Sequence, residues 1–395
     1  FFASVVAQLF FPPDMPEWLR QLQTFGIFAA GYLARPLGGI IMAHFGDRIG
    51  RKRMFMLSVL LMAVPTLLMG VLPTYATVGI LAPLLLLVLR ILQGAAVGGE
   101  VPGAWVFVAE HAPSGRSGFA IGVLTAGLTL GIVLGSAMSS FVNSFWQHDE
   151  VLAWAWRVPF LIGGAFGLLA VWLRRYLHET PVFEELRKRR ELVQGLPLKV
   201  VLQGHRMAVV RVMLITWTLT AGIVVVILMT PALVQSQYSI SAAEAANAST
   251  LATLALTLGC VIYGMAVDRF GTTRVLLVGS TGLALAAGGL YWTLQHAVGH
   301  FTLAFAISGL LVGVTGAIPS LMVNLFPAPI RFSGISFSYN VAYAICGGLT
   351  PLAVTLWLRA GEAYAPVYYV AAACLAGALA ILIARSAPSR ILATE

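Results

Sequence analysis

The sequence predicts an all-α membrane protein with twelve transmembrane helices, the first of them truncated, in two pseudo-symmetric six-helix bundles. Of its 395 residues, 59% are hydrophobic and 10% are charged, whereas a soluble domain carries about 25% charged residues. The apolar residues form runs of roughly 20 without two-residue alternation, which favours helices over a β-barrel. Two motif pairs also recur in the two halves of the chain, which indicates an internal repeat.

The apolar runs give the predicted helices in order. The first run begins at the first residue and is short, so we expect only part of that helix. One long polar connector, 178–206, separates the sixth and seventh runs, and its segment 183–191 is typical of an amphipathic helix lying on a membrane surface. This predicts an N-terminal bundle over 1–177, a linker over 178–206 and a C-terminal bundle over 207–395. The runs are 1–12, 20–43, 54–72, 78–107, 117–142, 158–177, 207–234, 245–266, 274–294, 301–323, 332–357 and 364–386.

The basic residues predict the orientation of the chain. Most of the 24 Lys and Arg residues fall in alternate connectors, on one side of the predicted membrane. The positive-inside rule makes that side cytoplasmic, including the linker. We therefore expect a multi-pass protein of the bacterial inner (plasma) membrane. The net charge of +9 follows from this topology, so we expect no nucleic-acid partner.

Two independent motif pairs recur at nearly the same separation along the chain. The pairs are Gly46-Asp47-Arg48-Ile49-Gly50-Arg51 with Val267-Asp268-Arg269-Phe270-Gly271, and Glu110 through Arg116 with Leu325 through Arg331. Each member follows an apolar run at the predicted cytoplasmic side. Two repeated halves around a midplane site are typical of proteins that work by alternating access.

Several motifs together resemble a known family. They are Ala34-Arg35-Pro36-Leu37-Gly38-Gly39, His44 through Lys52, Arg90-Ile91-Leu92-Gln93-Gly94, Gly98-Gly99-Glu100, Trp156 through Phe160, and Glu179 through Phe183. The chain resembles the major facilitator superfamily and, within it, the metabolite:proton symporters, whose members carry citrate, dicarboxylates, oxoglutarate, shikimate, or proline and betaine. The resemblance implies transport driven by the proton gradient, without a cofactor. Asn324 and Val101-Pro102-Gly103 depart from the family pattern, and both bear on the substrate.

Three ionisable residues stand inside the apolar runs: Arg35, Arg90 and Glu100. A charge at mid-membrane costs at least about 2.5–3.5 kcal/mol, so such groups are usually buried, paired and functional. We predict that Glu100 is the proton-coupling carboxylate, held near Arg35, and that Arg90 with Arg35 attracts an anionic substrate. The alternatives are a permanent Arg35–Glu100 clamp between helices, and an Arg90 that anchors packing by bonding backbone carbonyls.

The charged residues of the repeated motifs are predicted to gate the cytoplasmic side. At the helix ends they can bridge to neighbouring helices in one state and separate in the other, and the family resemblance implies the same conformational role. Plain solvated charge is the alternative. The predicted gating residues are Asp47, Arg48, Arg51, Glu110, Arg116, Asp268, Arg269 and Arg331.

Neutral polar residues are predicted to complete the substrate site. They are Thr125, Thr129, Trp217, Thr220, Asn340 and Tyr343. Asn340 and Tyr343 rank highest, because a buried polar group in lipid must find a partner. The alternative for the threonines is a hydrogen bond to their own helix backbone.

These observations predict a proton-coupled symporter that imports a small organic anion, namely a mono-, di- or tricarboxylate. A symporter of a zwitterionic osmolyte or amino acid, and exchange or uniport without proton coupling, remain alternatives. An enzyme is not expected, because no HExxH, GxSxG or Walker A pattern occurs. We expect no metal site, and as partners only the substrate, protons and the lipid bilayer. We expect a monomer.

Overall fold

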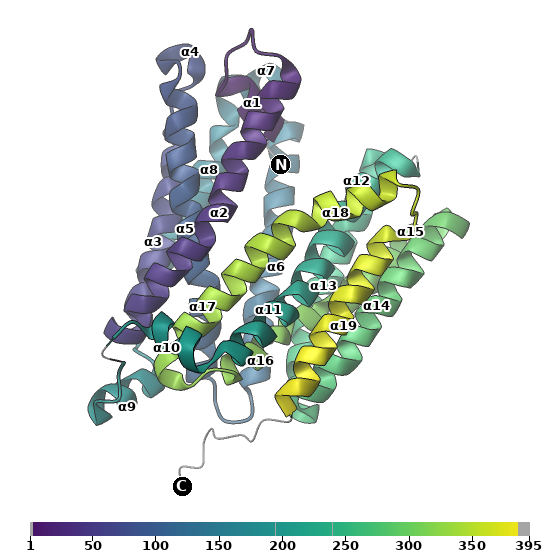
Figure 1. The fold of residues 1–395 in the computed structure, drawn as a ribbon. Coiled ribbons are helices and arrows are strands. Elements are labelled where there is room, and N and C mark those ends of the chain that lie inside the picture. The colour runs from purple at the N-terminus through teal and green to yellow at the C-terminus, as the bar shows by residue number, and fades with distance from the viewer. Residues whose placement is uncertain (1–2, 194, 239, 386–395) are drawn as a thin grey trace. The chain divides into compact units, whose positions relative to one another are not determined.

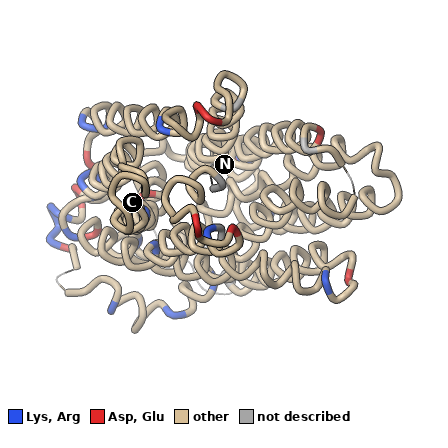
Figure 2. The backbone as a smooth tube through the Cα atoms, turned by 90° about the horizontal axis from the view of Figure 1, so that it is seen from above, with Lys and Arg blue, Asp and Glu red and all other residues tan. Residues whose placement is uncertain are grey.

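The computed structural model describes residues 3–193, 195–238 and 240–385, which form helices joined by short connections (Figure 1). These described ranges contain no β-strand, so the predicted all-α class is confirmed. Eleven helical segments among them are long and apolar enough to cross a membrane, judged by length and composition. Figure 2 shows how sparsely charged residues are placed along the backbone. Many large apolar side chains face outward, such as Leu33 (73% exposed), Val278 (72%) and Leu285 (71%), as expected where the surrounding medium is lipid.

Packing divides the helices into two compact units. The first contains Phe1–Gly103 and Leu134–Gln194, and the second contains Ala104–Val133 and Gly195–Glu395. Helices α5 (Leu81–His111) and α6 (Ser117–Phe145) thus contribute to both units. The division of the chain into 1–177, 178–206 and 207–395 stays a prediction.

The first unit contains three long helices of its own and parts of two others. Besides its parts of α5 and α6, it contains α1 (Ala3–Leu9), α2 (Glu17–Ile49), α3 (Arg51–Val71), α4 (Tyr75–Val78), α7 (His148–Glu150), the π-helical turn η1 (Val151–Ala155), α8 (Arg157–Arg174) and the linker helix α9 (Pro181–Arg189). Part of its core lies where Phe10 meets Trp156 edge to face, with ring centroids 5.5 Å apart.

The second unit contains three transmembrane segments that are interrupted by other helical types. These interruptions are η2 (Gly222–Met229, π), η4 (Gly313–Gly316, 3₁₀) and η6 (Tyr343–Gly347, π). The remaining elements are α10 (Pro197–Gly204), α11 (Arg206–Ala221), α12 (Thr230–Gln237), α13 (Ala242–Phe270), α14 (Thr272–His296), η3 (Val298–His300), α15 (Phe301–Val312), α16 (Ile318–Asn324), η5 (Ala328–Ile330), α17 (Arg331–Ala342), α18 (Gly348–Arg359) and α19 (Ala365–Arg385).

Glycines let α2 and α5 cross with their backbones in contact. A Cβ on Gly94 would overlap the carbonyl oxygen of Gly31, and a Cβ on Gly38 would overlap that of Ala95. Small residues at such positions are the usual means of close packing between membrane helices. This crossing fixes the relative heights of the side chains on α2 and α5.

The turn between α2 and α3 requires a glycine. Gly50 has φ of 133°, a conformation that side-chain-bearing residues rarely adopt. A Cβ there would also run into the carboxylate of Glu179. Gly271 has φ of 82° at the corresponding junction between α13 and α14, which shows the predicted repeat in the backbone.

Charged groups bind both ends of α3, which packs along α8. At its C-terminus, Nη1 of Arg157 donates to the carbonyls of Gly70 (3.2 Å) and Leu72 (2.7 Å). At its N-terminus, the backbone N–H of Lys52 donates to Oε1 of Glu179 at 3.0 Å. Both contacts satisfy helix-end groups that have no intrahelical partner and oppose the helix dipole.

The linker helix predicted around 183–191 is present as α9. Pro181 occupies its first turn, and the Thr180 hydroxyl accepts from the backbone N–H of Phe183 as a helix cap. Phe183 and Leu186 are buried, so one face of α9 packs on the protein and its basic face remains exposed.

Candidate functional site

Two arginines of the first unit line one cavity. Arg35 of α2 and Arg90 of α5 border an open cavity of about 300 Å³, together with Tyr32 and Gln93. Arg35 is buried, and its Cζ lies 5.9 Å from the ring centroid of Tyr32. Two cations at one small cavity create a positive potential that attracts anions.

Side chains, rather than backbone carbonyls, hold the Arg90 guanidinium. Its Nη1 donates to Oε1 of Gln93 at 3.2 Å, and its Cζ lies 4.5 Å from the ring centroid of Phe28. The side-chain amide of Gln93 donates in turn to the hydroxyl of Thr66 at 2.5 Å. These contacts differ from the carbonyl bonds expected of a packing anchor.

Arg90 also borders a second, larger cavity of the first unit. This cavity measures about 680 Å³ and is walled mostly by apolar residues of α1, α2, α6 and α8, among them Val6, Phe28, Met138 and Phe166. Arg90 therefore borders one cavity that a second cation also lines and another that is mostly apolar. This suits a molecule with a carboxylate and an uncharged part.

Glu100 is held by an arginine that sequence reasoning did not select. Its Oε1 lies 3.5 Å from Nη2 of Arg174, near the end of α8. Arg174 is itself anchored on α3, because its Nη1 donates to the carbonyl of Phe55 at 3.3 Å and its Cζ lies 3.7 Å from the Phe55 ring centroid. The predicted association of Glu100 with Arg35 stays a prediction, whereas the contact with Arg174 is a feature of the structure.

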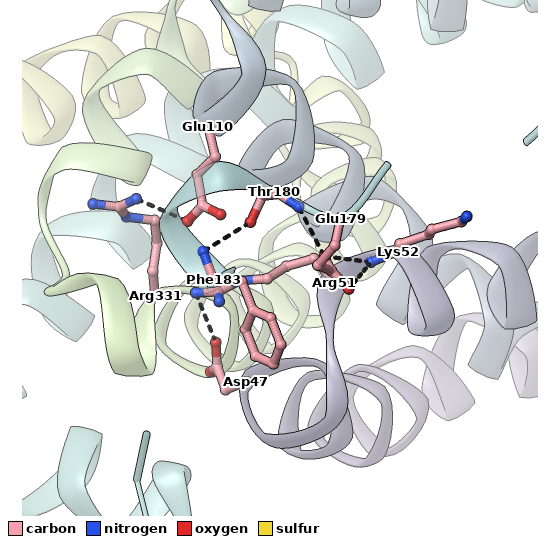
Figure 3. Close-up of polar contacts among 8 residues, drawn as sticks. All are labelled: Asp47, Arg51, Lys52, Glu110, Glu179, Thr180, Phe183 and Arg331. Carbon is pink, nitrogen blue, oxygen red and sulfur yellow. Dashed lines mark hydrogen bonds and ion pairs between the residues drawn. The ribbon is translucent and has the colours of Figure 1, made fainter. Parts of the chain in front are cut away.

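The predicted gating residues of the first unit gather at the α2–α3 junction. Asp47 and Arg51 are both buried and lie 3.7 Å apart, between Oδ1 and Nη2 (Figure 3). The ring of Phe183, from α9, lies 4.9 Å from Cζ of Arg51. Arg48 is exposed, and its Nη1 is 3.4 Å from Nε2 of His44. Asp47 and Arg51 are thus built into the packing at this junction, whereas Arg48 lies at the surface.

The predicted gating residues of the second unit form two contacts. Arg331 of α17 donates from Nη1 to Oε1 of Glu110 at 2.9 Å, and both side chains are largely buried (Figure 3). The carboxylate of Asp268 accepts from the backbone N–H groups of Gly118 and Phe119, both at 2.7 Å. Asp268 therefore caps the N-terminus of α6, where a negative charge is favoured. The remaining two, Arg116 and Arg269, are exposed.

The predicted neutral site residues all lie in the second unit, and most of them bond their own helix. Oγ1 of Thr125, Thr129 and Thr220 donates to a backbone carbonyl three or four residues earlier, as the alternative interpretation expected. Thr129 also lies 2.9 Å from the hydroxyl of Thr257 on α13. The amide nitrogen of Asn340 donates to the carbonyl of Ser336 at 2.7 Å.

The two aromatic members of this set pack in ring clusters. Trp217 meets Tyr369 edge to face, with centroids 5.8 Å apart, and Tyr343 lies 5.4 Å from Tyr339. Tyr339 in turn meets Trp105 of α5 at 4.9 Å. These rings tie α11 to α19 and α5 to α17 within the second unit.

Within the described ranges, no three His, Cys, Asp or Glu side chains come together as a metal site would need. The charged residues of the first unit that stand inside apolar runs are Arg35, Arg90 and Glu100. Three residues that hold them, Gln93, Thr66 and Arg174, were not selected from the sequence. The Arg-x-x-Gln spacing of Arg90 and Gln93 is the one signal that could have identified a member of this set, since residues three apart share a helix face.

Comparison with known proteins identifies the family of this chain. The sequence model of the Major Facilitator Superfamily matches residues 1–234. The chain belongs to the major facilitator superfamily. The family and its fold are those of transporters rather than enzymes, and this major facilitator is a multi-pass protein of the plasma membrane.

Curated relatives extend the match over nearly the whole chain. A Staphylococcus aureus (strain COL) protein named "Putative proline/betaine transporter" is 32% identical, covering 94% of this chain and 80% of that protein. The citrate-proton symporter of Klebsiella pneumoniae is 30% identical, over 96% of this chain and 86% of its own. The shikimate transporter of Escherichia coli (strain K12) is 31% identical, over 96% and 88%. The resemblance seen in the motifs is confirmed.

Solved structures agree on the fold. The proton:xylose symporter XylE bound to 6-bromo-6-deoxy-D-glucose superposes with a TM-score of 0.79 at 18% identity, covering 97% of this chain and 90% of that one. The human organic anion transporter MFSD10 superposes with a TM-score of 0.69 at 16% identity, covering 96% and 88%. At such identities the likeness concerns the fold alone.

Proposed function

We propose that this major facilitator is a proton-coupled importer of a small organic anion, namely a mono-, di- or tricarboxylate. The observation that carries the proposal is the pair of guanidinium groups, Arg35 and Arg90, on one cavity of about 300 Å³. Two cations at one small cavity create a positive potential, which would attract a substrate carboxylate. The names of the citrate and shikimate relatives support this choice, since both compounds are carboxylates.

Glu100 is the proposed proton carrier. It lies on the same helix as Arg90 and contacts Arg174 at 3.5 Å, so its protonation would change a contact that joins α5 to α8. A change of charge that alters contacts between helices is the kind of event that biases a transporter between two states. The driving force in this proposal is the proton gradient, and no cofactor is needed.

The cytoplasmic charged residues are the proposed gate. In the state described, Asp268 caps α6 and Glu110 pairs with Arg331. We propose that these contacts break when the cytoplasmic side opens, and that Asp47, Arg48, Arg51, Arg116 and Arg269 exchange partners with them. Thr125, Thr129, Trp217, Thr220, Asn340 and Tyr343 remain candidates for substrate contact. We propose that a monomer suffices, because one chain supplies the cavity, the carboxylate and the gate.

Uptake into proteoliposomes tests the proposal. Labelled citrate, succinate and shikimate are offered in parallel, each with and without an inward proton gradient, with glycine betaine as the zwitterionic comparison. We expect at least one carboxylate to accumulate, and only with the gradient. Equal uptake with and without the gradient would contradict proton coupling, and uptake of glycine betaine alone would contradict the anion assignment.

A further inference from the structure

The two π-helical turns of the second unit are followed by the same dipeptide. Thr230-Pro231 comes directly after η2, and Thr350-Pro351 follows η6 within one helical turn. A proline has no N–H, and its ring clashes with the carbonyl four residues earlier, so it disturbs the turn before it. π-Helical turns are rare and occur frequently at functional sites. The same pairing in two segments indicates a common role.

A proline alone does not interrupt a helix of this chain. Pro36, Pro65 and Pro102 stand inside α2, α3 and α5, and these helices continue through them as α-helices. An arginine or a valine precedes each of these three prolines, whereas a threonine precedes the two in the second unit. The threonine therefore distinguishes the prolines that follow π-helical turns.

The two threonine hydroxyls bond backward, into the turns that the prolines disturb. Oγ1 of Thr230 donates to the carbonyl of Val225, in η2, at 3.2 Å. Oγ1 of Thr350 donates to the carbonyl of Cys346, in η6. In membrane helices, threonine side chains and local π-helical turns are two ways to satisfy the backbone groups that a proline leaves free. Both are present at each of these prolines.

A tyrosine from a neighbouring helix contacts each threonine. The hydroxyl of Tyr291, on α14, lies 3.3 Å from Oγ1 of Thr230. The hydroxyl of Tyr369, on α19, lies 2.6 Å from Oγ1 of Thr350. A hydroxyl has one hydrogen to donate, and each threonine uses it on a carbonyl, so the tyrosines are the donors. Two different helices thus hold the two turns by the same contact.

The two turns also lie close to each other. α18 packs against η2, and α11 packs against η6. A Cβ on Gly347, in η6, would lie 3.7 Å from Cγ2 of Thr220, near the end of α11. Beyond the turns, α12 and α18 form the ends of their segments away from the linker helix α10 (Figure 1). Bending at one turn therefore displaces residues that pack on the other.

We propose that the two Thr-Pro turns are a pair of hinges, at which α12 swings relative to α11 and α18 swings relative to α17. The hydroxyls of Tyr291 and Tyr369 hold the two hinges in the π-helical state. Release of a tyrosine lets its turn tighten toward an α-helix, which changes the direction of the segment beyond it. Hinges of a few residues that absorb such a change are typical of domain closure. The inference goes beyond the proposed function, because it depends on neither the substrate nor proton coupling.

Hydrogen–deuterium exchange of the full chain in lipid nanodiscs tests the role of the tyrosines. Tyr291→Phe should raise backbone exchange over 222–230 at least about threefold, and Tyr369→Phe should do so over 343–350, because each turn loses a hydrogen bond that holds it. Tyr368→Phe is the matched control, because Tyr368 is exposed on α19 beside Tyr369, and it should change neither segment. Unchanged exchange in both Tyr291→Phe and Tyr369→Phe overturns the role of the tyrosines.

Threonine and proline variants test whether the tyrosine acts through the Thr-Pro turn. Thr350→Val should raise exchange over 343–350 at least as much as Tyr369→Phe, and adding Tyr369→Phe to it should bring no further rise. Thr350→Ser keeps the hydroxyl and should exchange like the unaltered protein. Pro351→Ala restores the missing N–H and should lower exchange over 343–350. Additive effects of Thr350→Val and Tyr369→Phe, or no change in Pro351→Ala, contradict this coupling.

Distances between spin labels test the swing itself. In a background in which alanine replaces the three native cysteines, one label is placed at the exposed His296, at the end of α14, and the other at the exposed Ser236 on α12 or Arg359 on α18. Double electron–electron resonance should show that Tyr291→Phe shifts the Ser236–His296 distances and that Tyr369→Phe shifts the Arg359–His296 distances. The control variant should shift neither. Raised exchange with both distance distributions unchanged would mean local loosening without a swing, and it would overturn the hinges.

Discussion

The α2–α5 crossing of the first unit and the α13–α15 crossing of the second share one set of backbone contacts. Gly38 meets the carbonyl of Ala95 in the first, and Gly259 meets that of Leu310 in the second. Gly94 meets Gly31 in the same way that Gly309 meets Ala252. The two crossings are therefore equivalent, although each belongs to its own unit.

The side chains around the two crossings are not equivalent. The matched glycines align the two crossings residue by residue. In this alignment Phe305 corresponds to Arg90, Leu256 to Arg35 and Thr315 to Glu100. All three replacements are fully or almost fully buried. The first unit thus has two cations and an acid where the second has two apolar side chains and a hydroxyl.

The two halves of the chain differ much less at these helix ends than in the interiors of the helices. Gly50 and Gly271 both adopt positive φ at their junctions, and Asp47 and Asp268 precede them in the same motif. The two halves therefore share acidic residues at these helix ends and differ in charge at the matched positions inside the helices. This difference supports the proposal that the charges at the helix ends form the gate, and that Arg35, Arg90 and Glu100 act on the substrate and the proton.

The largest effect on stability should come from the buried end charges. Glu110→Gln leaves Arg331 with an uncompensated buried charge and should lower the free energy of unfolding by about 3–5 kcal/mol. Thermal unfolding in detergent measures the change. The exposed Glu185–Arg189 pair provides the control, since Glu185→Gln should change stability by no more than about 1 kcal/mol. Equal effects at the two sites would contradict a structural role for the Glu110–Arg331 contact.

Substitutions at the two helix crossings should lower stability by an intermediate amount. Gly94→Ala and Gly309→Ala each place a Cβ against the backbone of the partner helix and should each cost about 1–3 kcal/mol. Thermal unfolding again provides the measurement. Gly26→Ala is the control, because among the described residues no atom outside its own stretch of helix lies within 4 Å of its Cβ position. A large loss at only one of the two crossings would break their equivalence.

The smallest effect should come from the cap on α6. Asp268→Ala removes the acceptor for two backbone N–H groups and should lower stability by about 1 kcal/mol. Asp149→Ala, at an exposed position, should have almost no effect. If the two variants unfold at the same temperature, Asp268 does not stabilise α6.

Much of the fold could be predicted from the sequence, because each part depends on local composition. The apolar runs predicted the long helices, the amphipathic segment predicted α9, and the repeated Asp-Arg motifs predicted equivalent junctions. The extra linker helix α10 and the π-helical turns within α11–α12 and α17–α18 were not predicted. Those features depend on packing in three dimensions, which hydropathy along the chain does not report.

The sequence predicted several residues of the candidate site but not which side chains they contact. Arg35, Arg90 and Glu100 could be selected because a charge inside an apolar run is conspicuous. Arg174 was not selected, because it stands near the end of its apolar run, although it contacts Glu100. Depth along a helix can be estimated from the sequence, but which side chains meet depends on the rotation of each helix about its axis. The Arg90–Gln93–Thr66 chain depends on that rotation.

We infer that Glu100, inside a helix of the first unit, drives transport and that Thr315, at the matching position of the second unit, does not. Gradient-driven accumulation of the transported carboxylate in proteoliposomes, measured side by side for Glu100→Gln and Thr315→Val, distinguishes the two positions. We expect Glu100→Gln to lose accumulation while still exchanging substrate, and Thr315→Val to accumulate like the unaltered protein. Accumulation by Glu100→Gln, or its loss in both variants, would contradict the claim.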